Sequence, residues 1–541
     1  MGSDWRVESE NIARHTFNSI TLSHSSSLPQ RSKALLSAIP PIIKALDILR
    51  SPLALDLDAA KKTHMSISRM CGLATLPEDI IQKILFHAVI NSSGAVEIQS
   101  SVQLSHVSRR FRKLALSTGD LWTDIRLSAS SKSLVEACIS RSGDCLVDVS
   151  CSIDISLRTS IQRALELIPL VIPIGNRWRT INLEFDSGPS HLGRDETPDI
   201  TDVFSVLEDL ILPNLRGVEI SNRLLLSLPV TFDGLHSPQI MSLFTKPFFG
   251  AHWVTPRLEA LNLQNYIPHG ASHPFLNLAS MTLHLTPFAW PCEHVVEWLA
   301  ACSSLTNLKL VLDRPHFKFG DAGSEATPTA LPSIRKLELR FLYENNVDSL
   351  NILKAVVFPG CLDLGIFIAT GEDNSVVRHE LQYEDDNWDT LELYNYAVTI
   401  FGDSQLFPSV ESLQLDFNIG QLGDFTGLSF DLLLENITSL KNLTLSSNLT
   451  LHLYIDTHIN DAWVRYPALR TVTLNCDYKP LKEWLMSLAE KLEIQGDWEG
   501  FEHLTVRVKD RVTKKWNDVT IPKTTMRSWS NVSFSTQLLS I

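Results

Sequence analysis

One arrangement of apolar residues recurs along most of the chain: an apolar residue, two others, a second apolar residue, one other and a third. From Leu261 to Val472 its central position returns every 20 to 30 residues. Because side chains alternate between the two faces of a strand, each occurrence predicts a short strand with one buried face. The occurrences are Trp178-Ile181-Leu183, Leu215-Val218-Ile220, Leu258-Leu261-Leu263, Leu278-Met281-Leu283, Leu305-Leu308-Leu310, Ile334-Leu337-Leu339, Cys361-Leu364-Ile366, Trp388-Leu391-Leu393, Val410-Leu413-Leu415, Leu440-Leu443-Leu445, Leu469-Val472-Leu474 and the weaker Phe501-Leu504-Val506.

Helical periodicity follows several of these predicted strands. The segments with helical spacing are 294–302, 347–357, 430–437 and 481–493. Strand followed by helix, repeated many times, predicts an α/β chain built as an irregular, curved solenoid. A compact α/β domain with a parallel sheet is the alternative interpretation.

Two further helical patterns precede the strands. In the first, Ile80, Ile84 and Ala88 recur at helical spacing after Pro77. In the second, an apolar stripe over 102–115 runs beside a basic face, before a late Leu-Trp pair. A module of about fifty residues hides too small a share of its surface to be comfortably stable alone, so we expect it to have a partner.

This module resembles the F-box family, whose pattern begins with Leu-Pro and a carboxylate and returns with Val, a basic pair, an aromatic residue and Leu-Trp. The chain departs from that pattern at Ser108, where the family often has Cys, at Phe111, where it often has Trp, and in an insert over 91–100. Such departures are typical of the divergent fungal branch. An ordinary three-helix core is the alternative. The matching residues are Leu76, Pro77, Ile80, Ile84, Leu85, Val107, Arg110, Phe111, Leu121 and Trp122.

The strands over about 175–510 resemble leucine-rich repeats. That family places Asn, or a substitute that hydrogen-bonds the turn backbone, three residues past the last apolar position. Polar residues of this kind are found there at Asp186, Asp313, Asn418, Asn448 and Asp477. The resemblance implies a horseshoe of stacked strand-and-helix units.

The patterns divide the chain into five expected regions. In the first, the apolar stripe over 35–49 predicts a helix, which Pro40 and Pro41 break or follow with the start of a new helix. The regions are a helical or flexible leader (1–70), an F-box-like domain (71–128), a connecting strand and helix (129–174), the leucine-rich-repeat-like solenoid (175–510) and a C-terminal cap or tail (511–541).

Composition narrows the class of protein. With 541 residues, of which 44% are hydrophobic and 20% charged, the chain is expected to fold as a soluble protein. Its net charge of −14 argues against general nucleic-acid binding and favours basic partners. No membrane span or secretory signal is expected, and the 8 cysteines form no disulfide framework, so we expect a cytoplasmic or nuclear protein.

The common catalytic motifs are absent, including Gly-x-Gly-x-x-Gly, the Walker loop, Gly-x-Ser-x-Gly and His-Glu-x-x-His. Cys292, His294 and Cys302 lack the paired spacing of a structural zinc site, so we interpret them as packing or surface residues. We expect no catalytic residue, no cofactor and no metal. An enzyme whose site is assembled from unlinked residues stays open as an alternative.

Taken together, the two resemblances imply the substrate-recognition subunit of an SCF-type ubiquitin ligase, which docks a Skp-type adaptor and cullin and holds a protein substrate on its repeats. A repeat scaffold without ubiquitylation is the alternative, and a merely solvated surface is the alternative for the substrate site. The expected adaptor-binding residues are Leu76, Pro77, Ile80, Ile84, Leu85, Val107 and Trp122. The expected substrate-binding residues, which lie between or beside the apolar positions, are Lys309, Glu338, Arg340, Glu392, Tyr394, Gln414 and Asp416.

Overall fold

The computed structural model describes most of the chain, and it divides the chain into two compact units. Unit 1 comprises residues 1–94 and 99–117, and unit 2 comprises 95–98 and 118–541. The described residues are 11, 14, 28–71, 76–90, 98–128, 130–154, 157–186, 201–223, 253–267, 275–286, 289–313, 315–318, 327–342, 347–369, 390–392, 394–418, 427–448, 450–454, 465–476, 481–509 and 516–523.

A single long helix, α2 (Leu28–Cys71), forms the first part of unit 1. It continues through Pro40 and Pro41, so the predicted break there is wrong. Each proline lacks the N–H that would bond the carbonyl four residues earlier, but the helix continues on both sides of the pair. Several large apolar side chains of α2 are exposed, including Leu36 at 67% and Leu55 at 69%.

Three shorter helices complete unit 1. The first, α3 (Glu78–Val89), begins directly after Pro77 and has Glu78 and Asp79 in its first turn, where carboxylates favour the helix dipole. The second predicted stripe is not one helix but two, α4 (Ile98–Ser105) and α5 (Arg109–Ser117). Ser108 separates them, because its side-chain oxygen accepts a hydrogen bond from the backbone N–H of Phe111 and so caps α5.

Unit 2 is built on one 14-stranded sheet whose strands follow each other in chain order. All neighbours are parallel except β20 and β21, which are antiparallel. The chain is therefore a mixed α/β protein with a large, mostly parallel sheet. The strands are β1 (Asp124–Arg126), β2 (Val147–Asp154), β3 (Trp178–Asp186), β4 (Gly217–Asn222), β5 (Ala260–Gln264), β6 (Ser280–Leu285), β8 (Asn307–Asp313), β11 (Lys336–Leu342), β13 (Asp363–Ala369), β15 (Ser412–Asn418), β17 (Asn442–Ser447), β19 (Thr471–Asn475), β20 (His503–Lys509) and β21 (Trp516–Pro522).

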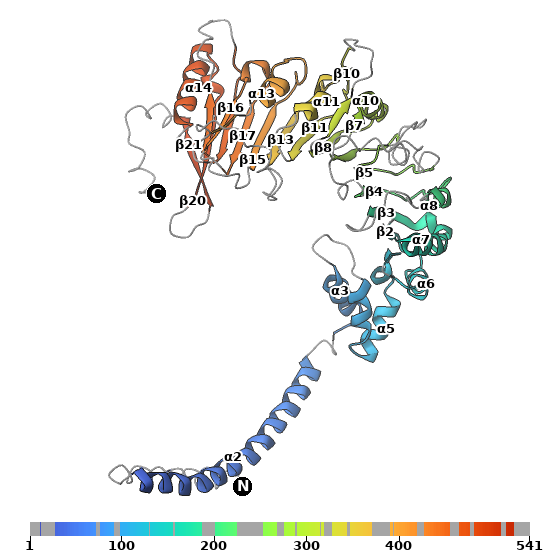
Figure 1. Ribbon diagram of the computed structural model, residues 1–541, viewed down its shortest axis with the longest axis vertical. Helices are drawn as coiled ribbons and strands as arrows, with labels where there is room; N and C mark the ends of the chain where they lie inside the picture. The colour runs from blue at the N-terminus through green and yellow to red at the C-terminus, as the bar shows by residue number, and fades with distance from the viewer. Residues whose placement is uncertain are drawn as a thin grey trace. The chain divides into compact units, whose positions relative to one another are not determined.

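Helices and small sheets lie along the outer side of the large sheet in unit 2 (Figure 1). The small sheets pair β7 (Ala289–Pro291) with β9 (His316–Lys318), β10 (Thr329–Ala330) with β12 (Val356–Val357), and β14 (Thr390–Glu392) with β16 (Gly427–Asp431) and β18 (Thr450–Tyr454). The helices are α6 (Lys132–Arg141), α7 (Arg158–Val171), α8 (Thr201–Val206), α10 (Cys292–Ala301), α11 (Asn351–Lys354), α13 (Tyr394–Phe401) and α14 (Lys482–Gln495), with the short 3-10 helices η3 (Gly119–Trp122), η4 (Ile172–Arg177), η7 (Val347–Leu350), η8 (Leu434–Asn436) and η9 (Trp498–Gly500).

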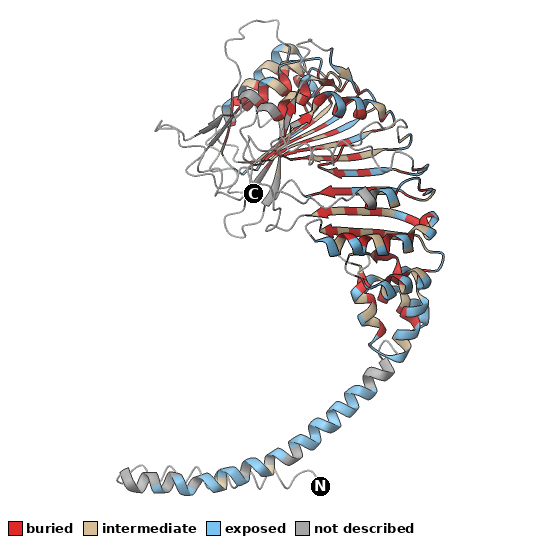
Figure 2. Ribbon diagram, turned by 45° about the vertical axis from the view of Figure 1, so that its right-hand side comes forward, coloured by how far each residue is buried: buried red, intermediate tan, exposed pale blue. Residues whose placement is uncertain are grey.

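The recurring apolar positions form continuous rows across the sheet. Leu337 of β11, for example, pairs in register with Leu308 of β8 and with Leu364 of β13. All three side chains are buried. Along each strand, the residues that alternate with the buried ones are half-buried or exposed, as the alternating colours in Figure 2 show. The core of unit 2 therefore lies between the apolar face of the sheet and the helices. We call the opposite face of the sheet the open face.

Three expectations about the strands are wrong. Leu391 lies in β14, which pairs with β16 in a small sheet and is not a strand of the large one. Segment 430–437 ends strand β16 and then forms η8, not an α-helix. The large sheet also extends beyond 175–510 at both ends, because it begins at β1 and finishes with β21.

Turns at one end of the strands are tied together by an asparagine. The Asn265 side chain accepts hydrogen bonds from the backbone N–H and the hydroxyl of Thr286, both over 2.9 Å, and donates one to the carbonyl oxygen of Asn222 over 3.0 Å. Asn265 is fully buried and has a φ of 52°. It lies one residue earlier than the predicted turn position. Of the predicted residues, Asp477 lies outside the described residues.

Candidate protein-binding surfaces

Helix α3 in unit 1 presents apolar residues on two sides. Ile81, Leu85 and Val89 are buried against the rest of the unit, at 0%, 1% and 2% exposure. Ile80 and Ile84, one turn apart, are each 38% exposed. Two apolar side chains next to each other on an exposed helical face are unfavourably hydrated. This row is therefore suited to contact with another protein.

Other apolar residues that match the family pattern are also exposed in unit 1. Val107, just ahead of α5, is 63% exposed, and Pro77 is exposed as well. Leu76 is half-buried, and its carbonyl oxygen accepts a hydrogen bond from the Arg110 guanidinium over 2.6 Å. That bond ties the start of α3 to α5. We call Pro77, Ile80, Ile84 and Val107 the α3 surface.

Two of the seven residues expected to bind an adaptor are interior. Leu85 is 1% exposed and belongs to the core of unit 1. Trp122 is also 1% exposed and falls in unit 2, where the Arg141 guanidinium carbon lies 4.4 Å from its ring centroid. Neither side chain is open to a partner, so the placement of Trp122 on one surface with the α3 residues is wrong.

A basic helix, α5, contacts α3 within unit 1. Arg109, Arg112 and Lys113 of α5 are exposed, and this helix has no acidic residue. Arg112 donates a hydrogen bond to the carbonyl oxygen of Ser105 over 3.1 Å, which fixes part of its side chain to the preceding helix. The positive charge contrasts with the net charge of −14 for the whole chain. A partner of the α3 surface is therefore expected to carry negative charge near its apolar contact.

On the open face of the sheet, three charged residues of β8 and β11 form one group. The ammonium group of Lys309 lies 2.9 Å from a carboxylate oxygen of Glu338, and Arg340 donates a hydrogen bond to the same oxygen. Burial acts to raise the pKa of Glu338, but the bonds from Lys309 and Arg340 outweigh it and hold that pKa below its usual value. These three predicted substrate-binding residues are brought together and neutralise one another in part.

An aromatic residue outside the predicted substrate-binding set lies next to this group. Phe367 of β13 pairs in register with Arg340, whose guanidinium carbon lies 4.6 Å from the ring centroid. The neighbouring open-face position is Gly365, where a Cβ atom would come within 3.0 Å of Cε2 of Phe367. The absence of a side chain at Gly365 thus leaves room for the ring. The sequence signal was present, because Phe367 follows Ile366 at an outward position of a predicted strand.

Asp416 of β15 flanks Phe367 on the side away from Arg340, since the two residues are paired in register. Burial raises the pKa of the Asp416 carboxyl, and attraction to Arg340 only partly opposes that effect. Within the described part of the chain, the Asp416 carboxylate makes no hydrogen bond or ion pair. Gln414, the other predicted residue on β15, is exposed two positions away on the same face.

Glu392 and Tyr394 do not lie on the open face beside these residues. Glu392 ends β14 of a small sheet, and Tyr394 begins helix α13. Their predicted alignment with Arg340 is therefore wrong. The error comes from the Trp388-Leu391-Leu393 pattern, which has the spacing found in strands of the large sheet. The strand that contains Leu391 is β14, and it pairs with β16 in a small sheet.

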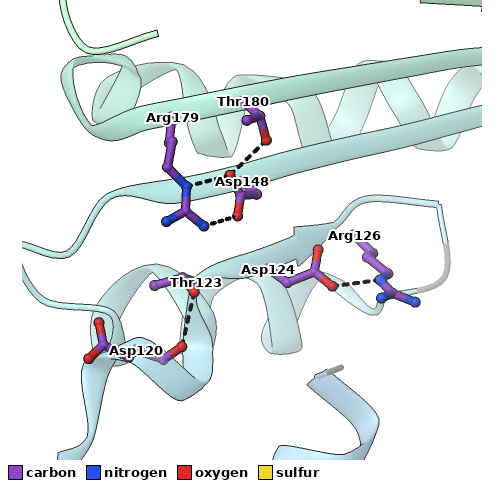
Figure 3. A network of polar contacts seen from close by, with 7 residues as sticks. All are labelled: Asp120, Thr123, Asp124, Arg126, Asp148, Arg179 and Thr180. Atoms are coloured by element: carbon purple, nitrogen blue, oxygen red, sulfur yellow. Dashed lines mark hydrogen bonds and ion pairs between the residues drawn. The ribbon is translucent and has the colours of Figure 1, made fainter. Parts of the chain in front are cut away.

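The charged residues at the start of the large sheet differ from Asp416, because the structure satisfies them internally. Asp148 of β2 accepts hydrogen bonds from Arg179 and, over 2.7 Å, from the hydroxyl of Thr180 (Figure 3). Asp124 of β1 accepts one from Arg126 over 2.8 Å. The Asp148 contacts join β2 to β3, the Asp124 contact lies within β1, and both carboxylates are engaged.

The described residues contain no group of three or more His, Cys, Asp or Glu side chains able to hold a metal ion. Cys292 and Cys302 are buried, and burial raises the pKa of each thiol to about 11, so both are protonated at neutral pH. Among the described helices, none is long and apolar enough to cross a membrane.

No family model matches the chain, and no curated protein matches its sequence.

Replacing Asp416 by Asn is expected to leave thermal stability at pH 7 unchanged or to raise it. The folded-state pKa of this carboxyl is raised, so the folded protein binds more protons than the unfolded chain between the two pKa values. Stability therefore falls as pH rises through that range, and the amide removes this loss. Thermal unfolding of both proteins between about pH 4 and pH 7 measures it. A lower melting temperature for the variant at pH 7 would mean that the carboxylate stabilises the fold.

Proposed function

We propose that this protein is the substrate-recognition subunit of an SCF-type ubiquitin ligase. In this proposal the α3 surface of unit 1 docks a Skp-type adaptor, which links the chain to a cullin. The open face of the sheet in unit 2 holds a protein substrate. The protein itself carries out no bond chemistry, and it promotes ubiquitin transfer by holding the substrate close to the loaded enzyme.

The observation that carries this proposal is the exposed pair of Ile80 and Ile84 on α3, with Pro77 exposed directly before that helix and Val107 exposed before α5. These are residues at which the sequence resembles the F-box family. A few buried apolar anchors supply most of the energy of a typical interface. The resemblance of the repeated strands to leucine-rich repeats gives further support, because consecutive parallel strands in chain order leave a broad face on which a substrate can bind.

Reconstitution with purified components tests this function. The full chain is expected to form a stable complex with a Skp-type adaptor and to join a complex with a cullin, measured by size-exclusion chromatography with light scattering. A protein bound by the chain in cells should then receive ubiquitin only when adaptor and cullin are both present. Absence of adaptor binding would contradict the proposal.

A repeat scaffold that binds proteins without ubiquitylation is the second candidate. It predicts that the chain binds its partner but recruits no cullin, so the same reconstitution separates the two functions. The exposed α3 row favours the ligase subunit, because a scaffold acting through the sheet alone has no need of that surface.

A further inference from the structure

The carboxylate of Asp416 stands out among the open-face carboxylates of unit 2. Glu338 is paired with Lys309 and Arg340, and Asp148 with Arg179 and Thr180. Within the described residues Asp416 has only the more distant attraction of Arg340. A half-buried carboxylate without a hydrogen bond loses hydration that nothing in the described chain replaces.

The surroundings of Asp416 supply the remaining parts of a cation site. The Phe367 ring is next to Asp416 in register, with Arg340 on the side of the other neighbouring strand. The ring lies over Gly365, where a Cβ atom would come within 3.0 Å of Cε2 of Phe367, so the glycine lets the ring lie close to the sheet. An aromatic ring attracts a cation placed over its face, and the attraction is stronger where water is partly excluded.

We propose that the open face at β13 and β15 binds a protein segment through one Lys or Arg side chain, which enters between the Phe367 ring and the Asp416 carboxylate. This inference rests on the proposed function, and it names the class of substrate: a segment with an accessible basic residue. The cation would form an ion pair with Asp416 and a cation–π contact with Phe367. Gln414, exposed on the same face, offers an amide to the backbone of the segment.

The charges around the site favour a basic ligand over an acidic one. Lys309 and Arg340, the nearest cations of the group, already share Glu338. An acidic side chain beside the Phe367 ring would meet Asp416, which repels it. The net charge of −14 adds a weaker, long-range attraction for basic segments.

A degenerate octapeptide library, bound to the immobilised full-length protein and sequenced, tests the inference. We expect enrichment of Lys or Arg at one position with the wild type. A peptide made from the enriched sequence should bind about tenfold more weakly to Asp416→Asn, since a charge-assisted contact is lost. Phe367→Leu should weaken it in the same direction, and added salt should weaken the wild-type complex.

Glu219→Gln is the matched control, because it also removes one carboxylate from the open face but lies on β4, where Glu219 accepts a hydrogen bond from Asn262. Its binding should equal that of the wild type. Selection of acidic or apolar residues, no selection, or equal binding by the wild type and Asp416→Asn would overturn the inference. Adaptor binding, measured on the same preparations, separates this failure from failure of the proposed function.

Discussion

Replacing Ile80 and Ile84 together by Asp is expected to weaken the binding of a purified Skp-type adaptor by about a thousandfold. Buried anchors of an interface cost about 2 kcal/mol or more each when lost, and about 4 kcal/mol corresponds to three orders of magnitude in the dissociation constant. Both side chains are 38% exposed, so the fold of unit 1 should persist. Titration calorimetry measures the affinity, and circular dichroism checks the fold.

Ile494→Asp is the control for that experiment. Ile494 of α14 is 77% exposed and lies in unit 2. The substitution Ile494→Asp removes an exposed isoleucine and adds one negative charge, as each of the two substitutions on α3 does. Its adaptor affinity should match that of the wild type. If the double variant bound normally, or if the control lost as much affinity, the α3 surface would not be the docking site.

Replacing Leu443 by Asp is expected to destabilise unit 2 by more than about 4 kcal/mol, because a large core side chain is lost and a carboxylate is buried in its place. Leu443 of β17 is 0% exposed and pairs in register with Leu413 of β15 and Val472 of β19. Amide hydrogen exchange should therefore rise first in these neighbouring strands.

Thr444→Asp provides the comparison for Leu443→Asp. Thr444 is the next residue along β17 and is half-buried on the open face. There the new carboxylate keeps contact with water, so we expect a loss below about 1 kcal/mol. Chemical denaturation of both variants measures the difference. Equal losses would mean that the two faces of the strand are not distinguished by burial.

Most strands of the large sheet could be predicted from the sequence. Burial of one face makes apolar residues alternate with others along each strand, and this alternation is visible within a few residues. The set around Leu391 shows the limit of that method. It has the same spacing as the set around Leu364, yet only the latter pairs within the large sheet. Strand partners are chosen by long-range packing, which a local pattern does not contain.

The helical regions show a second limit. Segment 430–437 has apolar residues compatible with both periods, and the chain uses Phe430 as a buried strand residue. At Pro40, a helix break is predicted because proline lacks a backbone N–H. The long helical segments on both sides stabilise α2 enough for it to continue through this position. Ser108 departs from the family pattern, and serine is also a residue type that commonly caps helices, so the start of α5 could be predicted at this position.

The two candidate surfaces were predictable to different degrees. The sequence pattern brought out Lys309, Glu338 and Arg340, because they occupy outward positions of regular strands. It missed Phe367, which a search for the charges and aromatics at every outward position would have found. It also grouped Trp122 with the α3 residues, because nearness in sequence does not reveal to which unit a tryptophan belongs.

The central claim is that a Skp-type adaptor docks on the α3 surface. Amide hydrogen exchange of the full chain, with and without a saturating concentration of purified adaptor, tests it most directly. We predict slower exchange in α3 and in the turn that holds Val107, with the strands of the large sheet unchanged. Protection confined to unit 2, or no protection anywhere, would contradict the claim.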